Sequence, residues 1–102
     1  MDRTIVDYLH ALVRANGSDL HLSVGMPPSL RVSGELCQLK ADVLTEDALY
    51  KLLMSVLTDT QRAKLEGNCE LDFALNIDNV GRFRGNAHYI RGAVEATFRH
   101  IL

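Results

Sequence analysis

The chain has 102 residues, of which 47% are hydrophobic and 24% charged, and this composition is typical of one compact domain with its own core. A formal net charge of -2 lacks the positive field that draws proteins to nucleic acid, so DNA and RNA binding are not expected. No apolar run approaches the roughly 18 residues that a membrane span requires, and the N-terminus has no signal-peptide stretch, so we expect a soluble, cytoplasmic protein.

The first part of the chain has the pattern of a helix followed by short strands. Apolar residues at helical spacing between positions 5 and 13 predict a helix, with Thr4 as its N-cap and Asn16-Gly17 as its end. Apolar and polar residues alternate over 19–24, which predicts a strand that ends at Gly25-Met26-Pro27-Pro28. Two further short strands are expected at 29–32 and 36–39.

Two helices are expected in the middle of the chain. Thr45 precedes two acids and an apolar stripe at helical spacing, which predicts a helix that packs on the sheet. The stripe consists of Leu49, Leu52, Leu53, Val56 and Leu57. Thr58 and Gln61 form a capping-box pattern, which predicts a second, short helix through Leu65 that is closed by Gly67-Asn68.

Three strands in succession are expected after these helices. Residues 70–77 alternate, Asp78-Asn79-Val80-Gly81 forms a turn, and extended segments follow at 82–90 and 93–101, with Arg91-Gly92 between them. This pattern predicts an antiparallel meander. Because strands occur in runs and not in βαβ units, we predict an α+β fold with helices packed on an antiparallel sheet.

The cysteines and histidines do not indicate a metal site. Cys37 and Cys69 form no CxxC motif, and the four histidines lack the spacing of zinc ligands, so neither a disulfide nor a metal ion is expected. We expect both cysteines to be small, buried, apolar side chains.

The strand predicted at 82–90 carries the first candidate functional face. Alternation places four polar side chains on one face of it: Arg82, Arg84, Asn86 and His88. An arginine suits an anion because its planar fork donates several hydrogen bonds to phosphate oxygens and stays charged, and Arg91 and Arg99 could extend this cluster. The pattern alone favours an exposed face of hydrated arginines, and the anion site remains the alternative interpretation.

Two other groups of polar residues resemble parts of catalytic sites. They are Asp19, His21 and Ser23 in one group and Glu70 and Asp72 in the other. The first group has no spacing that orients a nucleophile or builds an oxyanion hole, so we expect Ser18 and Asp19 to bond the helix-to-strand turn instead. The second group is expected to be hydrated or to pair with the meander arginines.

No phosphate-binding loop of the G-x-x-x-x-G-K-[ST] or G-x-G-x-x-G type occurs in these 102 residues. We therefore expect no catalytic residue in this chain and no ATP hydrolysis by it alone. Any nucleotide chemistry has to be completed by residues elsewhere.

A series of motifs resembles the N-terminal domain of PilT-like twitching-motility ATPases, which belong to the type II/IV secretion ATPase superfamily. The opening motif runs from SDLHL at 18–22 through G-x-P-P at 25–28 to R-V-x-G at 31–34. Similar stretches follow in order at 44–46, 57–62, 70–73, 80–84 and 91–101. The resemblance spans nearly the whole chain.

The resemblance implies that residues 1–102 form a single N-terminal PAS-like domain and that a RecA-like motor domain, absent from this chain, follows it. The parent protein would be a hexameric ATPase that powers type IV pilus retraction. ATP and Mg²⁺ would lie between the two domains, and the resemblance carries Arg84, Arg91 and Arg99 over as phosphate contacts, with Arg82 a weaker choice.

The implied partners are the motor domain of the same chain, the neighbours in a homo-hexamer, and a pilus or secretion platform at the inner membrane. The protein would be cytoplasmic and peripheral to that membrane. The alternatives are the N-terminal domain of a pilus-assembly or type II secretion ATPase, or a freestanding PAS-like binding module. One departure from the family is Gly85, which stands where a β-branched residue is usual and predicts a loosened strand or a bulge.

Overall fold

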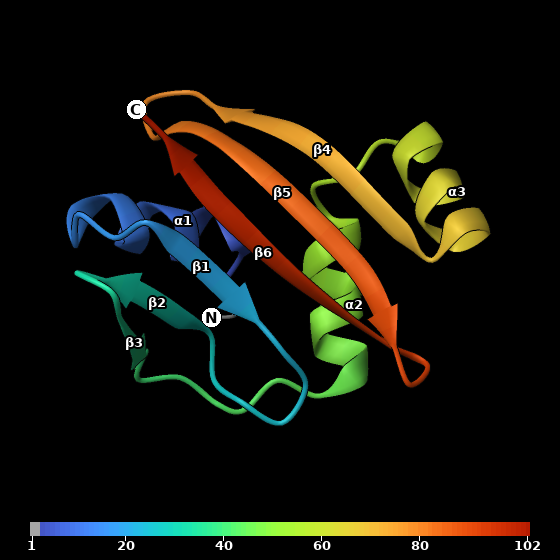
Figure 1. Cartoon of the computed structure of the whole chain (residues 1–102), viewed down its shortest axis with the longest axis horizontal. Helices are drawn as coiled ribbons and strands as arrows, with labels where there is room; N and C mark the ends of the chain where they lie inside the picture. The colour runs from blue at the N-terminus through green and yellow to red at the C-terminus, as the bar shows by residue number, and fades with distance from the viewer. Residues whose placement is uncertain (1–2) are drawn as a thin grey trace.

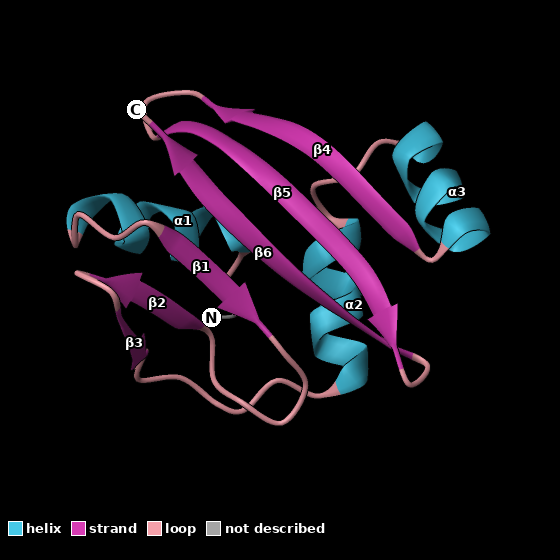
Figure 2. Cartoon of the chain, viewed as in Figure 1, coloured by secondary structure: helices cyan, strands magenta, loops and turns pink. Residues whose placement is uncertain are grey.

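The computed structural model describes residues 3–102, which form a six-stranded antiparallel sheet with helices packed behind it (Figures 1 and 2). The elements in chain order are α1 (Ile5–Arg14), β1 (Asp19–Leu22), β2 (Ser29–Val32), β3 (Glu35–Gln38), α2 (Glu46–Met54), α3 (Asp59–Asn68), β4 (Glu70–Ile77), β5 (Gly81–Ile90) and β6 (Ala93–Ile101). The predicted α+β class and the predicted order of elements are confirmed.

The sheet has the strand order β3-β2-β1-β6-β5-β4, so β6 lies in its middle and joins the two halves of the chain. It pairs with β5 through a tight hairpin and with β1 through contacts that are distant in sequence. Arg91 and Gly92 form the hairpin turn, both at positive φ (52° and 82°), a conformation that fits the twist of the two strands. The same backbone pattern at Ser33 and Gly34 joins β2 to β3.

Threonine caps begin all three helices, as the sequence predicts. The Thr4 side chain accepts a hydrogen bond from the Asp7 backbone N–H, and the Asp7 carboxylate accepts one from the Thr4 backbone at 2.8 Å. Thr58 and Gln61 form the same reciprocal pair at the start of α3, with distances of 2.9 and 3.1 Å. Thr45 accepts from a backbone N–H of α2. No helix within residues 3–102 is both long and apolar enough to span a bilayer.

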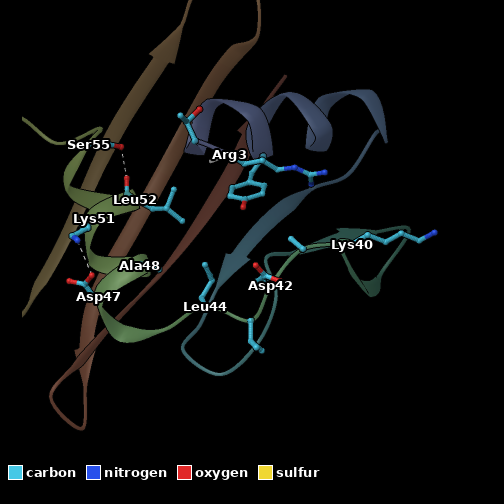
Figure 3. A pocket seen from close by; sticks show the side chains of 13 residues that line it. Arg3, Lys40, Asp42, Leu44, Asp47, Ala48, Lys51, Leu52 and Ser55 are labelled. Carbon is cyan, nitrogen blue, oxygen red and sulfur yellow. Dashed lines mark hydrogen bonds and ion pairs between the residues drawn. The ribbon is translucent and has the colours of Figure 1, made fainter. Parts of the chain in front are cut away.

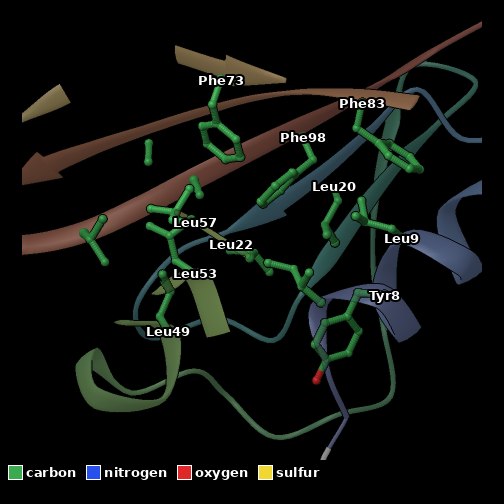
Figure 4. Packing of buried hydrophobic residues seen from close by; sticks show 14 of the residues in the cluster. Tyr8, Leu9, Leu20, Leu22, Leu49, Leu53, Leu57, Phe73, Phe83 and Phe98 are labelled. Atoms are coloured by element: carbon green, nitrogen blue, oxygen red, sulfur yellow. The ribbon is translucent and has the colours of Figure 1, made fainter. Parts of the chain in front are cut away.

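The core lies between the sheet and helices α1 and α2 (Figure 4). Leu9 and Leu12 of α1 and Leu49 and Leu53 of α2 are fully buried. Leu9, Leu49 and Leu53 lie on the same side of the sheet as Phe98. Each such side chain contributes about 1.5–3 kcal/mol through its removal from water. The stripe predicted for α2 is confirmed at its buried positions, although its last two members follow the end of the helix.

Several boundaries differ from the sequence predictions, and β5 begins at Gly81, one residue earlier than expected. β1 ends at Leu22, and Val24 is 38% exposed because the chain turns away to pair with the segment before α2, where Gly25 donates to the Leu44 carbonyl at 2.8 Å. β3 begins and ends one residue earlier than expected. α3 continues through the predicted stop at Gly67-Asn68, and Cys69 at φ 59° closes it instead.

The prediction that both cysteines are buried is wrong. Cys37 lies on the edge strand β3, where every residue is exposed, and Cys69 occupies the exposed left-handed cap of α3. Hydropathy favours burial of a thiol, but strand position and helix-cap geometry decide these two cases.

Gly85 does not mark a bulge, which is one of the two outcomes that the sequence predicts for it. Its register is continuous with Phe73 on β4 and Phe98 on β6. A Cβ atom built on Gly85 would lie 2.3 Å from Cζ of Phe73. The Phe73 ring therefore occupies the space that a side chain at position 85 would need. The Phe73 ring meets Phe98 edge to face, with centroids 5.7 Å apart.

Candidate functional site

The candidate site lies on the face of the sheet away from the helices. β5 has buried Phe83, Gly85 and Ala87 on the helix side and more exposed polar residues on the other, so the predicted alternation is confirmed. The polar side chains of this strand are Arg82, Arg84, Asn86 and His88.

Arg84 and Arg99 form the centre of this polar face. They are direct cross-strand partners on β5 and β6, an arrangement that holds Cα atoms about 4.5–5.5 Å apart. Arg84 is exposed and makes no hydrogen bond or ion pair with any residue from 3 to 102. Two like charges opposite one another repel, and an anion bound between the two guanidinium groups would offset this repulsion.

Asp19 is the acidic partner of this pair. Its carboxylate accepts a hydrogen bond from Arg99 Nε at 3.2 Å and one from the Ser18 hydroxyl at 2.7 Å, while its side chain is only 8% exposed. Burial raises the pKa of the Asp19 carboxyl, but the hydrogen bonds from Ser18 and Arg99, with the charges of Arg99 and His21, outweigh burial and hold this pKa below its ordinary value.

Arg31, which also lies opposite Asp19, is engaged elsewhere. Its guanidinium donates to the Gly34 carbonyl at 2.9 Å and so holds the turn between β2 and β3. Within the described chain, Arg99 is therefore the arginine that pairs with the Asp19 carboxylate.

Arg91 lies far from Arg84 and Arg99. It occupies the β5–β6 turn, seven residues along the strand from Arg84, which corresponds to about 23 Å at the usual rise of a strand. The structure thus brings together two of the three arginines that the resemblance implies, and it leaves the third at the opposite end of the hairpin.

A second polar network crosses the same face and was not predicted from the sequence. His88 Nε2 lies 2.9 Å from Glu95 Oε1, and Asn86 Nδ2 donates to Asp72 Oδ1 at 2.8 Å. Of the two outcomes expected for Glu70 and Asp72, the structure supports exposure to solvent, since both side chains are exposed and neither forms an ion pair with an arginine in the described chain.

The Asp19, His21 and Ser23 group does not form a catalytic triad. Asp19 binds Arg99, the Nδ1 atom of His21 lies 3.5 Å from Thr97 Oγ1, and the Ser23 hydroxyl donates to Glu95 at 3.4 Å. No serine hydroxyl forms a hydrogen bond with a histidine ring in residues 3–102. The same residues contain no cluster of three potential metal ligands.

A separate cleft of about 660 Å³ lies on the helix side of the molecule, between the start of α1, residues 40–44 and α2 (Figure 3). Leu44 and Leu52 supply apolar wall, and Lys51 pairs with Asp47 at 2.9 Å on its rim. None of the arginines implied by the resemblance lines this cleft.

Comparison with known sequences identifies relatives among pilus ATPases. The chain is 34% identical over 97 residues to the type IV pilus retraction ATPase PilT of Pseudomonas aeruginosa, covering 95% of this chain and 28% of the relative. It is 32% identical over 93 residues to the type IV pilus ATPase PilU of the same organism, covering 91% of this chain and 24% of that protein. The chain therefore spans about a quarter of each relative. No family model matches it.

Solved structures agree with these relatives. The crystal structure of the pilus retraction motor PilT with bound ADP superposes with a TM-score of 0.93 at 36% identity, over 99% of this chain and 30% of that one. The ATPase DotB of Legionella pneumophila superposes with a TM-score of 0.79 at 24% identity, over 96% of this chain and 28% of that one. At that identity, the similarity to DotB shows a shared fold and nothing about function.

Proposed function

The chain is the N-terminal domain of a PilT-like ATPase of the type II/IV secretion superfamily, and on this premise we propose that it contacts nucleotide and regulates a hexameric motor that retracts type IV pili. In this proposal a RecA-like motor domain supplies the Walker motifs and binds ATP and Mg²⁺. The partners would be that motor domain, neighbouring subunits and an inner-membrane pilus platform. The working location would be the cytoplasmic side of that membrane.

The observation that supports this function best is the Arg84–Arg99 pair. Both guanidinium groups lie on the helix-free face, where a docked domain can reach them, and Arg84 has no partner within residues 3–102. Arginines that face a transferring phosphoryl group stabilise the charge of the transition state, and such a contact is worth about 10³ to 10⁵ in rate.

The three arginines that the resemblance implies lie in two places on the sheet. Arg84 and Arg99 can meet one phosphate group together, whereas Arg91 lies about 23 Å along the hairpin by strand rise. In our proposal the pair contacts the phosphates of one nucleotide. Arg91 would contact a different part of the ligand or a neighbouring subunit.

The test measures ATP turnover in the protein that includes the motor domain. Arg84→Ala is the cleanest variant, because Arg84 has no partner to lose among the described residues. We expect kcat to fall by roughly 10² or more while the free energy of unfolding changes by under about 1 kcal/mol. Arg84→Lys keeps the charge but loses the planar fork, so a comparable defect would indicate bidentate contact.

Arg82→Ala is the graded comparison, since Arg82 is the weaker candidate contact and lies on the same strand and the same face but opposite Ile101. We expect it to retain turnover within a few-fold. Arg99→Ala and Arg91→Ala complete the set, with assembly state measured for each variant. Near-normal kcat for Arg84→Ala and Arg99→Ala in an intact assembly would refute the proposed contact and favour the hydrated-face interpretation.

The helix-side cleft favours one second candidate, a small-molecule binding module. Its volume of about 660 Å³ lies in the range of ligand pockets, and it combines leucine walls with charged rims. Native mass spectrometry of the purified chain tests this function. A stoichiometric bound small molecule, lost on Leu52→Arg substitution, would support it.

A further inference from the structure

We propose that Asp19 is a positioning residue that orients Arg99 for phosphate binding. The inference rests on the proposed function, because it assumes that Arg99 and Arg84 receive an anion. Asp19 itself faces no ligand in this proposal and acts only through the arginine.

The Asp19 carboxylate is itself fixed by its surroundings. One oxygen accepts from Arg99 Nε at 3.2 Å, and the other accepts from the Ser18 hydroxyl at 2.7 Å. The residue also sits between two strands, with Arg31 opposite it on β2 and Arg99 opposite it on β6. A nearly buried carboxylate with both oxygens engaged is a rigid anchor.

The contact engages only one of the donor nitrogens of Arg99. Nε is bound, while the two terminal nitrogens make no hydrogen bond within residues 3–102 and the side chain remains 72% exposed. Anchoring at Nε restricts the long side chain near the base of its fork. Binding of an anion to the terminal nitrogens then costs less side-chain conformational entropy.

Simple electrostatics makes the opposite prediction, and this difference gives the inference its test. Removal of a carboxylate next to an arginine pair leaves the site more positive, so charge alone predicts tighter anion binding. Loss of the anchor predicts weaker binding. Asp19→Asn removes the charge but keeps an oxygen that can accept from Arg99 and Ser18, whereas Asp19→Ala removes both.

The experiment titrates the 102-residue chain with tripolyphosphate at low salt and follows the arginine Nε–H signals by NMR. We expect Arg84→Ala and Arg99→Ala each to weaken binding about tenfold or more. Asp19→Ala should weaken it about three- to tenfold, and Asp19→Asn should bind as tightly as the unmodified chain or more tightly. Asp72→Ala removes another acid from the same face and should not weaken binding.

The outcomes separate the two proposals. If binding depends on both arginines but Asp19→Ala binds equally or more tightly, the positioning role is refuted and the proposed function stands. If tripolyphosphate does not bind, or binds independently of Arg84 and Arg99, both are refuted.

The anchor also has a direct signature in the unmodified chain that does not depend on a folded alanine variant. The Arg99 Nε–H should exchange with solvent more slowly than the Arg84 Nε–H, and Asp19→Asn should leave part of this protection. Equal exchange at the two arginines would overturn the inference.

Discussion

Substituting Gly85 by alanine should destabilise the fold through one neighbour, the Phe73 ring. The added Cβ would lie 2.3 Å from Cζ and 2.6 Å from both Cε atoms, far inside an ordinary carbon contact of about 3.5–4.0 Å. The ring has little room to move, because Phe98 meets it edge to face. Overpacking of this kind costs about 1–3 kcal/mol, and removing a strand glycine offsets about 0.5–1 kcal/mol. We expect a net loss of about 1–2 kcal/mol.

The cause is tested by relieving the clash from the other side. In a Phe73→Leu background the same Gly85→Ala change should be neutral or stabilising, which corresponds to a coupling energy of about 1–3 kcal/mol. Gly67→Ala is the matched control, because a Cβ at Gly67 in α3 would meet no atom within 4 Å. That change should stabilise the chain by about 0.5 kcal/mol.

Urea unfolding followed by far-ultraviolet circular dichroism measures the free energy of unfolding of the unmodified chain and of each variant, and this probe suits a chain without tryptophan. Gly85→Ala at or above the stability of the unmodified chain would refute the packing argument. An equal cost of Gly85→Ala with and without the Phe73 ring would refute it as well, because the clash would then not be the cause.

Three further predictions concern stability. The pKa of Asp19 is lowered in the folded chain, so its ionised carboxylate contributes to the free energy of unfolding above about pH 4. This contribution is lost as the pH falls through the folded pKa. Asp19→Asn should therefore flatten the loss of stability in urea unfolding across acidic pH. Burial and the 2.7 Å hydrogen bond to Glu66 raise the pKa of Tyr89 to about 12. The protonated phenol therefore contributes to the free energy of unfolding below about pH 10, and this contribution is lost as the pH rises from about 10 to about 12. Tyr89→Phe should remove that decline in urea unfolding at alkaline pH. Thr58→Ala removes a capping box and should lower the free energy of unfolding by about 1 kcal/mol, whereas an unchanged urea midpoint would contradict this.

The fold could be predicted because its signals are local. The caps at Thr4, Thr45 and Thr58 need only residues three positions away, and the strands of the meander alternate without interruption. The sequence predictions fail where the position of a strand in the sheet determines the exposure of a residue or the end of a strand. Exposure of Cys37 follows from the edge position of β3, and the early end of β1 follows from pairing with the segment before α2. Neither can be read from a short window of sequence.

The candidate site could be predicted in part. The Arg91-Gly92 turn already sets the hairpin register, and counting outward from it pairs Arg84 with Arg99 and separates both from Arg91. The role of Asp19 could not be found in this way. Asp19 contacts Arg99, 80 residues away in the sequence, through a β1–β6 pairing that no local sequence pattern predicts.

The central place of β6 also bears on how the domain forms during protein synthesis. β6 is the ninth element in chain order, yet it separates β1 from β5. Before it leaves the ribosome, the β1–β3 ribbon and the β4–β5 hairpin each present an open edge to other chains. Closure of the sheet must then join residues 80 apart, a distant pairing of the kind that slows folding. The two halves of the sheet therefore become one cooperative unit only after translation of the last strand.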